Sequence, residues 1–210
     1  MSRPAVPTAD FALLPRGNAT ASGLMIASPR GRMLDAMAQV VAIKGYATAT
    51  VADVVSAAGV SRKTFYEHFT DKEDCFLAAC DYAGGALHDA IARVLARTRT
   101  PRERLEVLVR TYLRSLAASP RGAIAFIIEA RAATPKIRAQ HRKILERFAE
   151  LVRHPDAPAD ADPQSGLYRL AGVIAVEDIA AQEIADGRAK NLNKLEDTLL
   201  ELAIRIVGVP

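Results

Sequence analysis

The segment from residue 50 to residue 76 places the strongest constraint on the fold, because it encodes two short helices joined by a glycine turn. Thr50 is a suitable N-cap for the first helix, and Ser61 is a suitable N-cap for the second. Gly59, between them, lets the chain turn sharply. The first helix presents one apolar stripe for burial, formed by Val51, Val54, Val55 and Ala58. This layout is typical of a helix-turn-helix that reads DNA.

The second of these helices divides into a buried face and an exposed polar face. Phe65 and Phe69 stand four positions apart, so both side chains point back to the core. The outward face carries Arg62, Lys63, Thr64, Tyr66 and His68. Such side chains can donate hydrogen bonds to phosphates and base edges. Asp71 then caps a further helix, with Asp74 three residues later as an incomplete capping box.

Two stretches of this region carry a family resemblance. Gly-Tyr-Ala-Thr-Ala-Thr at 45–50 and Phe-Tyr-Glu-His-Phe-Thr-Asp-Lys-Glu-Asp at 65–74 resemble the TetR family of bacterial transcriptional regulators. The similarity is specific over roughly residues 30 to 80. Beyond them, only helical pattern and length agree. The resemblance implies a homodimeric, mostly repressive regulator whose DNA affinity falls when a small molecule binds the larger domain.

The resemblance also implies how individual residues meet DNA. Arg62, Lys63 and Thr64 occupy base-facing positions, whereas Thr50, Tyr66, His68 and Lys72 match phosphate contacts. The fork of Arg62 can donate to O6 and N7 of one guanine together, which makes it the best candidate for a guanine reader. Glu67 either accepts from a cytosine amino group or braces Lys63 four positions earlier. A two-fold dimer places two such helices in successive major grooves, so the operator should be an inverted repeat of double-stranded DNA.

Helix-start signals along the whole chain predict an all-α fold. Caps followed by proline occur at Ser28-Pro29, Thr100-Pro101, Ser119-Pro120, Thr134-Pro135 and Asp162-Pro163. With the helix-turn-helix they give about nine helices, the others covering 29–44, 72–96, 101–118, 120–132, 135–153, 165–186 and 191–207. We interpret residues 1–27 as a flexible extension. Residues 28–74 then form a three-helix DNA-binding domain, and residues 75–210 form a helical ligand-binding and dimerisation domain.

The long helix from Lys72 contains two adjacent glycines, Gly84 and Gly85, which are poor helix formers. A kink at this point would act as a hinge between the DNA-binding domain and the ligand domain. The alternative is that the glycines permit close packing of a neighbouring helix.

Apolar stripes in the second domain could line a cavity or fill a solid core. A cavity would suit a small hydrophobic or amphipathic effector. The candidate ligand-binding residues are Leu105, Val109, Tyr112, Ile124, Ile127 and Glu129. Tyr112 and Glu129 are the polar groups expected to turn inward, although Glu129 could instead pair with Arg131 or Arg138.

The last two predicted helices carry stripes that suit a four-helix interface between two copies of the chain. The candidate dimer residues are Leu167, Leu170, Ile174, Leu195, Leu199 and Leu202. Burial of the same stripes within one chain is the alternative.

Other classes of protein find little support in the sequence. The histidines are scattered and form no metal-binding pair, and no phosphate-cradling glycine loop or nucleophile elbow occurs. We therefore expect no enzyme, no metal and no cofactor. The absence of a long apolar run predicts a cytoplasmic protein without a membrane partner. The net charge of +4 permits a polyanionic partner without requiring one.

Two further readings stay open at this point. Cys75 and Cys80 stand five positions apart on one predicted helix and face different directions, which favours reduced thiols over a redox-sensing pair. A regulator that binds DNA but ignores ligands is the other alternative.

Overall fold

The computed structural model describes residues 28–153 and 164–208, and the regular secondary structure in these ranges consists of helices without a strand. The elements are α2 (Pro29–Lys44), α3 (Val51–Ala58), α4 (Arg62–His68), α5 (Lys72–Leu95), α6 (Pro101–Ala118), α7 (Pro120–Ala123), the π-helix η1 (Ile124–Glu129), α8 (Ala130–Ala132), α9 (Pro135–Val152), α10 (Ser165–Ala185), the 3₁₀-helix η2 (Ala189–Lys194) and α11 (Glu196–Val207). The predicted all-α fold is confirmed. None of the described helices is both long enough and apolar enough to span a bilayer.

Most helices begin at the predicted caps. The side chains of Ser28, Thr100 and Thr134 each accept a hydrogen bond from a backbone amide three residues later, and proline follows each of them. Ser119 is the exception, because its side chain makes no cap bond. The expected extension at 1–27 and the signal at Asp162-Pro163 lie outside the described residues.

Two helix predictions need correction. The helix expected over 120–132 is interrupted by the six-residue π-helix η1 between α7 and α8. The last helix was expected to start near Asn191, but α11 starts at Glu196 after a 3₁₀ segment. In that segment Leu192 is fully buried, so the chain makes a tight turn around an anchored side chain before the α-helix begins.

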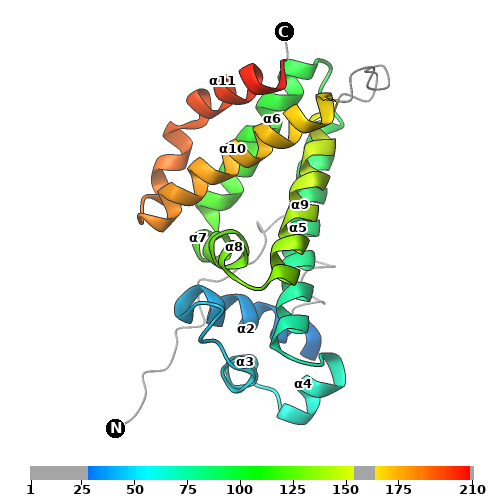
Figure 1. The fold of residues 1–210 in the computed structure, drawn as a ribbon, viewed down its shortest axis with the longest axis vertical. Coiled ribbons are helices and arrows are strands. Elements are labelled where there is room, and N and C mark those ends of the chain that lie inside the picture. The colour runs from blue at the N-terminus through cyan, green and yellow to red at the C-terminus, as the bar shows by residue number, and fades with distance from the viewer. Residues whose placement is uncertain (1–27, 154–163, 209–210) are drawn as a thin grey trace.

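The helices divide the molecule along its length (Figure 1). α2, α3 and α4 pack at one end, α6, α10 and α11 lie towards the other, and α5 runs beside α9 between them. The short segment α7-η1-α8 crosses the middle and contacts both α2 and α10. This segment therefore connects the two ends independently of α5.

Two hydrophobic cores correspond to these two ends. The first surrounds α2, where Met33, Leu34 and Met37 are buried, and it includes Phe65 and Phe76. It also takes in residues of the middle segment and α9, namely Ala125, Ala130 and Ile137. The second core fills the space between α6, α9, α10 and α11. The proposed boundary at residue 74 remains a prediction, and the first core extends across it.

α5 continues without interruption through Gly84 and Gly85. A Cβ atom added at Gly84 would lie 3.1 Å from Cδ1 of Ile144 on α9. This contact supports the close-packing alternative at Gly84, whereas a Cβ at Gly85 would meet only an Arg147 nitrogen at 3.9 Å.

Candidate functional site

The helix-turn-helix forms as the sequence predicts. Gly59 takes a left-handed conformation (φ 62°, ψ 41°) that ends α3, and Ser61 caps α4 by accepting from the amide of Thr64. Within α3, Val54 and Ala58 are buried and the other two valines of the stripe are half-buried. Phe65 and Phe69 are buried with their ring centroids 5.6 Å apart. The turn thus fixes the direction in which α4 presents its outer face.

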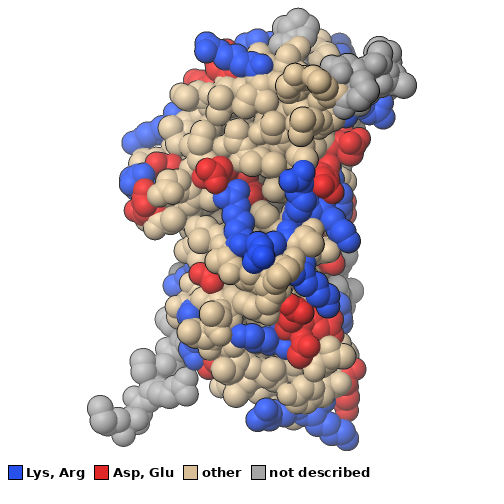
Figure 2. Space-filling view, in the orientation of Figure 1, with Lys and Arg blue, Asp and Glu red and all other residues tan. Residues whose placement is uncertain are grey.

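The outer face of α4 is exposed and basic. Arg62, Lys63, Tyr66 and His68 are exposed, and Thr64 is half-buried. Neither Arg62 nor Lys63 forms an ion pair with another residue in the described ranges. Figure 2 shows lysine and arginine side chains projecting at the end of the molecule where α3 and α4 lie. The expected brace between Lys63 and Glu67 is likewise absent among the described residues, so this interpretation was wrong.

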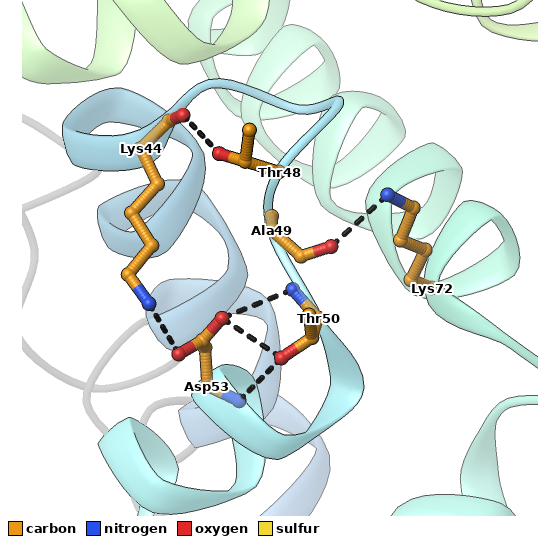
Figure 3. Close-up of polar contacts among 6 residues, drawn as sticks. All are labelled: Lys44, Thr48, Ala49, Thr50, Asp53 and Lys72. Atoms are coloured by element: carbon orange, nitrogen blue, oxygen red, sulfur yellow. Dashed lines mark hydrogen bonds and ion pairs between the residues drawn. The ribbon is translucent and has the colours of Figure 1, made fainter.

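Thr50 forms a complete capping box at the start of α3 (Figure 3). Its hydroxyl accepts from the amide of Asp53 at 3.2 Å, and the Asp53 carboxylate accepts from the Thr50 amide at 3.1 Å. Lys44 pairs with the same carboxylate. Hydrogen bonds from Lys44 and Thr50 lower the pKa of Asp53. The carboxylate therefore stays ionised and orders the entrance to α3.

Lys72 has internal partners rather than a free ammonium. Its Nζ donates to the carbonyl oxygens of Tyr46, Ala47 and Ala49 at 2.9, 3.2 and 3.0 Å. It also lies 4.6 Å from the centroid of the Tyr46 ring. An ammonium has three N–H donors, so all of them are used within the chain. Lys72 would have to release some of these bonds to contact a phosphate.

Glu129 is not among the residues that line the pocket described below, and it binds the backbone before α3 instead. Its Oε2 accepts from the backbone amide of Tyr46 at 2.8 Å, which joins η1 to the turn before α3. The suggested partners Arg131 and Arg138 bind elsewhere, to Glu177 and to a backbone carbonyl. The suggested pairing with Arg131 or Arg138 was wrong, because the long-range contact of Glu129 with residue 46 leaves no local pattern in the sequence.

A pocket opens between α6, α9, α10 and α11. It is partly open to solvent and leaves about 20 Å³ for the centres of water-sized molecules, and it is lined by Leu105, Leu108, Val109, Tyr112, Phe148, Val152, Arg169, Gly172, Val173, Val176, Ala203 and Val207. Three candidate ligand residues, Leu105, Val109 and Tyr112, lie on its wall. Ile124 and Ile127 pack in the same second core as these three residues but do not line the pocket.

Arg169 is the cation in this otherwise apolar lining, and its side chain is almost fully buried. Its guanidinium lies 3.4 Å from Ser165 Oγ and 3.9 Å from Glu150 Oε1. Arg169 and Glu177 were not predicted as site residues from the sequence. Their positions in the sequence could have indicated them, because both charged residues fall within the apolar stripe of the helix over 165–186.

Glu177 centres a buried polar cluster beside the pocket. Its carboxylate accepts from Tyr112 Oη at 3.1 Å and Arg131 at 2.8 Å, and lies 2.9 Å from Nε2 of His141. Arg131 also donates to Asp178 at 2.7 Å. Burial and the Glu177 charge raise the pKa of Tyr112, which keeps the hydroxyl protonated as a donor. Burial would lower the pKa of Arg131, but the charges and hydrogen bonds of Glu177 and Asp178 together outweigh burial and raise this pKa.

The candidate dimer residues divide by exposure. Leu167 is 62% exposed, whereas Leu170 and Leu199 are buried within their own chain. Ile174, Leu195 and Leu202 are half-buried. Leu199 belongs to the second core and is covered by residues of its own chain, so its side chain is not available for contact with a second chain. Tyr168 and Ile179 on α10 are exposed and were not anticipated.

Cys75 and Cys80 are both free thiols and both buried, in agreement with the simpler prediction. Burial raises the pKa of each thiol to about 12. No group of histidine, cysteine, aspartate and glutamate side chains in the described part of the chain is placed to hold a metal ion.

Comparison with known proteins places these features in context. Residues 33–79 match the model of the tetR family of bacterial regulatory proteins. The chain is 29% identical over 96 residues to the transcriptional activator FasR of Mycolicibacterium smegmatis, covering 46% of this chain and 44% of that protein. It is 24% identical over 121 residues to the fatty acid metabolism regulator protein of Bacillus subtilis, covering 58% and 62%. These alignments thus span less than two thirds of the curated relatives.

The fold is also shared with solved structures. FadR from Bacillus subtilis, in complex with stearoyl-CoA, has a TM-score of 0.71 at 20% identity and covers 85% of this chain and 98% of its own. FadR from Bacillus halodurans, described as a fatty acid degradation regulator, has a TM-score of 0.70 at 22% identity and covers the same shares. On the family match and the observed helix-turn-helix, residues 33–79 form a DNA-binding domain of the tetR family of bacterial regulatory proteins.

Proposed function

We propose that this protein is a dimeric transcriptional repressor that binds an inverted-repeat operator and is released by an amphipathic effector. The observation that carries DNA binding is the exposed outer face of α4, where Arg62 and Lys63 project without ionic partners among the described residues. Arginine at such a position can donate two hydrogen bonds to guanine. The contacts of one chain are few, so two chains are needed to accumulate affinity for DNA.

The pocket supports the class of effector. An apolar cavity with Arg169 in its wall suits a ligand that has a hydrocarbon chain and an anionic group. The likeness to FadR, solved with stearoyl-CoA, supports a fatty acyl ligand of this chemistry. Ligand and DNA must then oppose each other by the same factor at equilibrium.

Fluorescence anisotropy at one fixed salt concentration tests DNA binding. The probe is DNA from upstream of the protein's own gene, compared with a shuffled duplex. Arg62→Ala should weaken binding to the cognate site more than binding to the shuffled duplex, by a difference of about 1 to 3 kcal/mol. Equal losses on both would make Arg62 a backbone contact.

Stearoyl-CoA and stearate test the effector. Both should lower operator affinity in the parent protein, and Arg169→Gln should weaken their effect. Arg102→Gln is the matched control, because Arg102 pairs only with Glu201 on the surface. If neither compound releases the DNA, the ligand-insensitive alternative is favoured.

A further inference from the structure

The turn that leads into α3, residues 45–50, is held from two directions. Lys72 binds three of its carbonyl oxygens from α5, and Glu129 binds the Tyr46 amide from η1. Gly45 adopts a positive φ of 77°, and a Cβ atom there would lie 3.2 Å from Glu129 Oε2. The carboxylate therefore lies directly against the backbone. Any displacement of Glu129 must change the path of the chain towards the cap at Thr50.

Glu129 is the last residue of a π-helix. A π-helical turn contains an extra residue, and π-turns are rare and often occur at functional sites. Conversion of η1 to α-helix would rotate side chains across the turn by about 100°. An α-helical arrangement of this segment would therefore no longer aim Glu129 at the Tyr46 amide.

The same segment is tied to the pocket two residues further on. Arg131 in α8 donates to both Glu177 and Asp178 of α10. Glu177 also accepts from the hydroxyl of Tyr112, whose side chain forms part of the pocket wall. The chain of contacts from the pocket to the turn is therefore Tyr112, Glu177, Arg131, η1 and Glu129. Every residue in it is buried or half-buried.

We propose that occupancy of the pocket is transmitted to the helix-turn-helix through this relay, with Glu129 as the residue that positions the turn before α3. A ligand that displaces the Tyr112 hydroxyl would remove one hydrogen-bond donor from the Glu177 carboxylate. The hydrogen bond between Glu177 and Arg131 would then change. The π-turn then shifts, and the Tyr46 amide loses its acceptor. This inference deepens the proposed function and rests on it for the ligand, but the contacts themselves can be tested without ligand or DNA.

Amide hydrogen exchange measured by NMR on the full chain provides that test. Tyr112→Phe keeps the buried ring and removes only the hydroxyl. It should accelerate exchange of the Tyr46 amide by at least about threefold, the effect of weakening one hydrogen bond. The Arg99 amide, which donates to Glu103 at 2.8 Å, is the internal reference and should be unchanged. Tyr168→Phe is the matched variant, because it removes a tyrosine hydroxyl that bonds to Gln164 on the surface.

Arg131→Met provides a second variant, with urea unfolding as the check that it still folds, because it removes an ionic partner of the buried Glu177. It should also accelerate Tyr46 exchange. In a Glu129→Ala background, neither Tyr112→Phe nor Arg131→Met should have a further effect on that amide. Unchanged Tyr46 exchange in both single variants would overturn the relay.

The functional arm compares operator release by stearoyl-CoA in Glu129→Ala, Glu129→Gln and Glu103→Ala. Glu129→Ala should reduce the fold-change in DNA affinity caused by the probe, while Glu129→Gln, which retains an acceptor, should restore much of it. Glu103→Ala removes a comparable carboxylate-to-amide bond outside the relay and should behave as the parent. A full response in Glu129→Ala would also overturn the proposal. If stearoyl-CoA fails in the parent as well, the effector proposal fails, and the exchange data alone decide the relay.

Discussion

Several residues expected to contact DNA already have partners within the free chain. The Thr50 hydroxyl and the Lys72 ammonium both hold the approach to α3 (Figure 3). Lys63, by contrast, has no ionic partner among the described residues. Residue type alone does not separate these cases, because lysine and threonine serve equally well as structural donors and as phosphate contacts. Substitution can separate them by measuring folding and DNA binding independently.

Lys72→Met should lower the free energy of unfolding by about 2 kcal/mol, since three carbonyl oxygens lose a charged donor. Lys63→Met, its control on the exposed face of α4, should change stability by less than about 0.5 kcal/mol while weakening DNA binding. Urea unfolding and anisotropy measure the two effects. Equal stability of the two variants would contradict the structural role of Lys72.

The buried thiols should be unreactive in the folded protein. Burial raises the pKa of Cys75 and Cys80 from 9.0 to about 12, so almost no thiolate exists at pH 8. A thiol reagent such as DTNB should modify them only as the chain unfolds, whereas Ser56→Cys, at an exposed position, should react at once. Rapid modification of Cys75 or Cys80 in the native parent would revive the redox-sensing alternative.

The same shifts fix the sign of a pH effect on stability. Above pH 9 the unfolded thiols lose protons while the folded thiols keep theirs. The unfolded state is therefore favoured as pH rises from about 9 to about 12, and the free energy of unfolding should fall over that range. Cys75→Ala with Cys80→Ala should show a smaller fall in urea titrations at several pH values.

At the scale of the elements, helix boundaries could be predicted where the signal is local. A cap side chain bonds to an amide three residues away, so Ser28, Thr100 and Thr134 could be identified from the sequence alone. The π-turn could not, because its apolar sequence Ile-Ala-Phe-Ile-Ile is equally compatible with an α-helix. The hydrogen bond of its last residue, between Glu129 and Tyr46, joins positions 83 residues apart and leaves no local pattern in the sequence.

The two glycines of α5 offer a matched test of helix packing. Gly85→Ala should raise the free energy of unfolding by about 0.5 to 1 kcal/mol, because alanine is the better helix former and little lies nearby. Gly84→Ala should lack this gain or lower stability, since its methyl group would press on Ile144 at 3.1 Å. Thermal and urea unfolding give both values. Equal gains would contradict close packing at Gly84.

The same pair tests the hinge interpretation. A functional hinge requires flexibility at both glycines, so both alanine variants would then lose ligand-induced DNA release. A response that survives in Gly85→Ala, with its full fold-change, would exclude a hinge that depends on this residue.

For the molecule as a whole, the pocket and the relay depend on side chains that converge from separate helices. Tyr112 and Glu177 are 65 residues apart, and Arg131 lies between them in sequence. Helical periodicity could predict that Leu105 and Val109 are buried, but it could not decide which stripe lines a cavity and which fills the core. The dimer surface posed the same difficulty, since Leu167 and Leu199 stand on equally convincing stripes and only one is exposed.

Exposure on α10 leads to a prediction about assembly. Tyr168 and Ile179 are 45% and 38% exposed, and their spacing of eleven residues, about three helical turns, places them on one side of the helix. In a dimer that covers this side, Ile179→Arg would bury an unpaired charge and should raise the dimer dissociation constant by at least about tenfold. Sedimentation equilibrium measures it, with urea unfolding as a check that the chain still folds.

Val94→Arg is the control, because Val94 has a similar exposure of 41% but lies on α5. It should leave association unchanged.

Loss of the dimer in Ile179→Arg should also reduce operator affinity far more than affinity for a single half-site, because two recognition helices must engage successive major grooves together. Leu199→Ala separates folding from assembly, since this residue is 1% exposed and its truncation should cost about 2 to 5 kcal/mol of stability. A parent protein that stays monomeric at micromolar concentration would refute the α10 interface. It would also refute the proposal that a dimer binds an inverted-repeat operator.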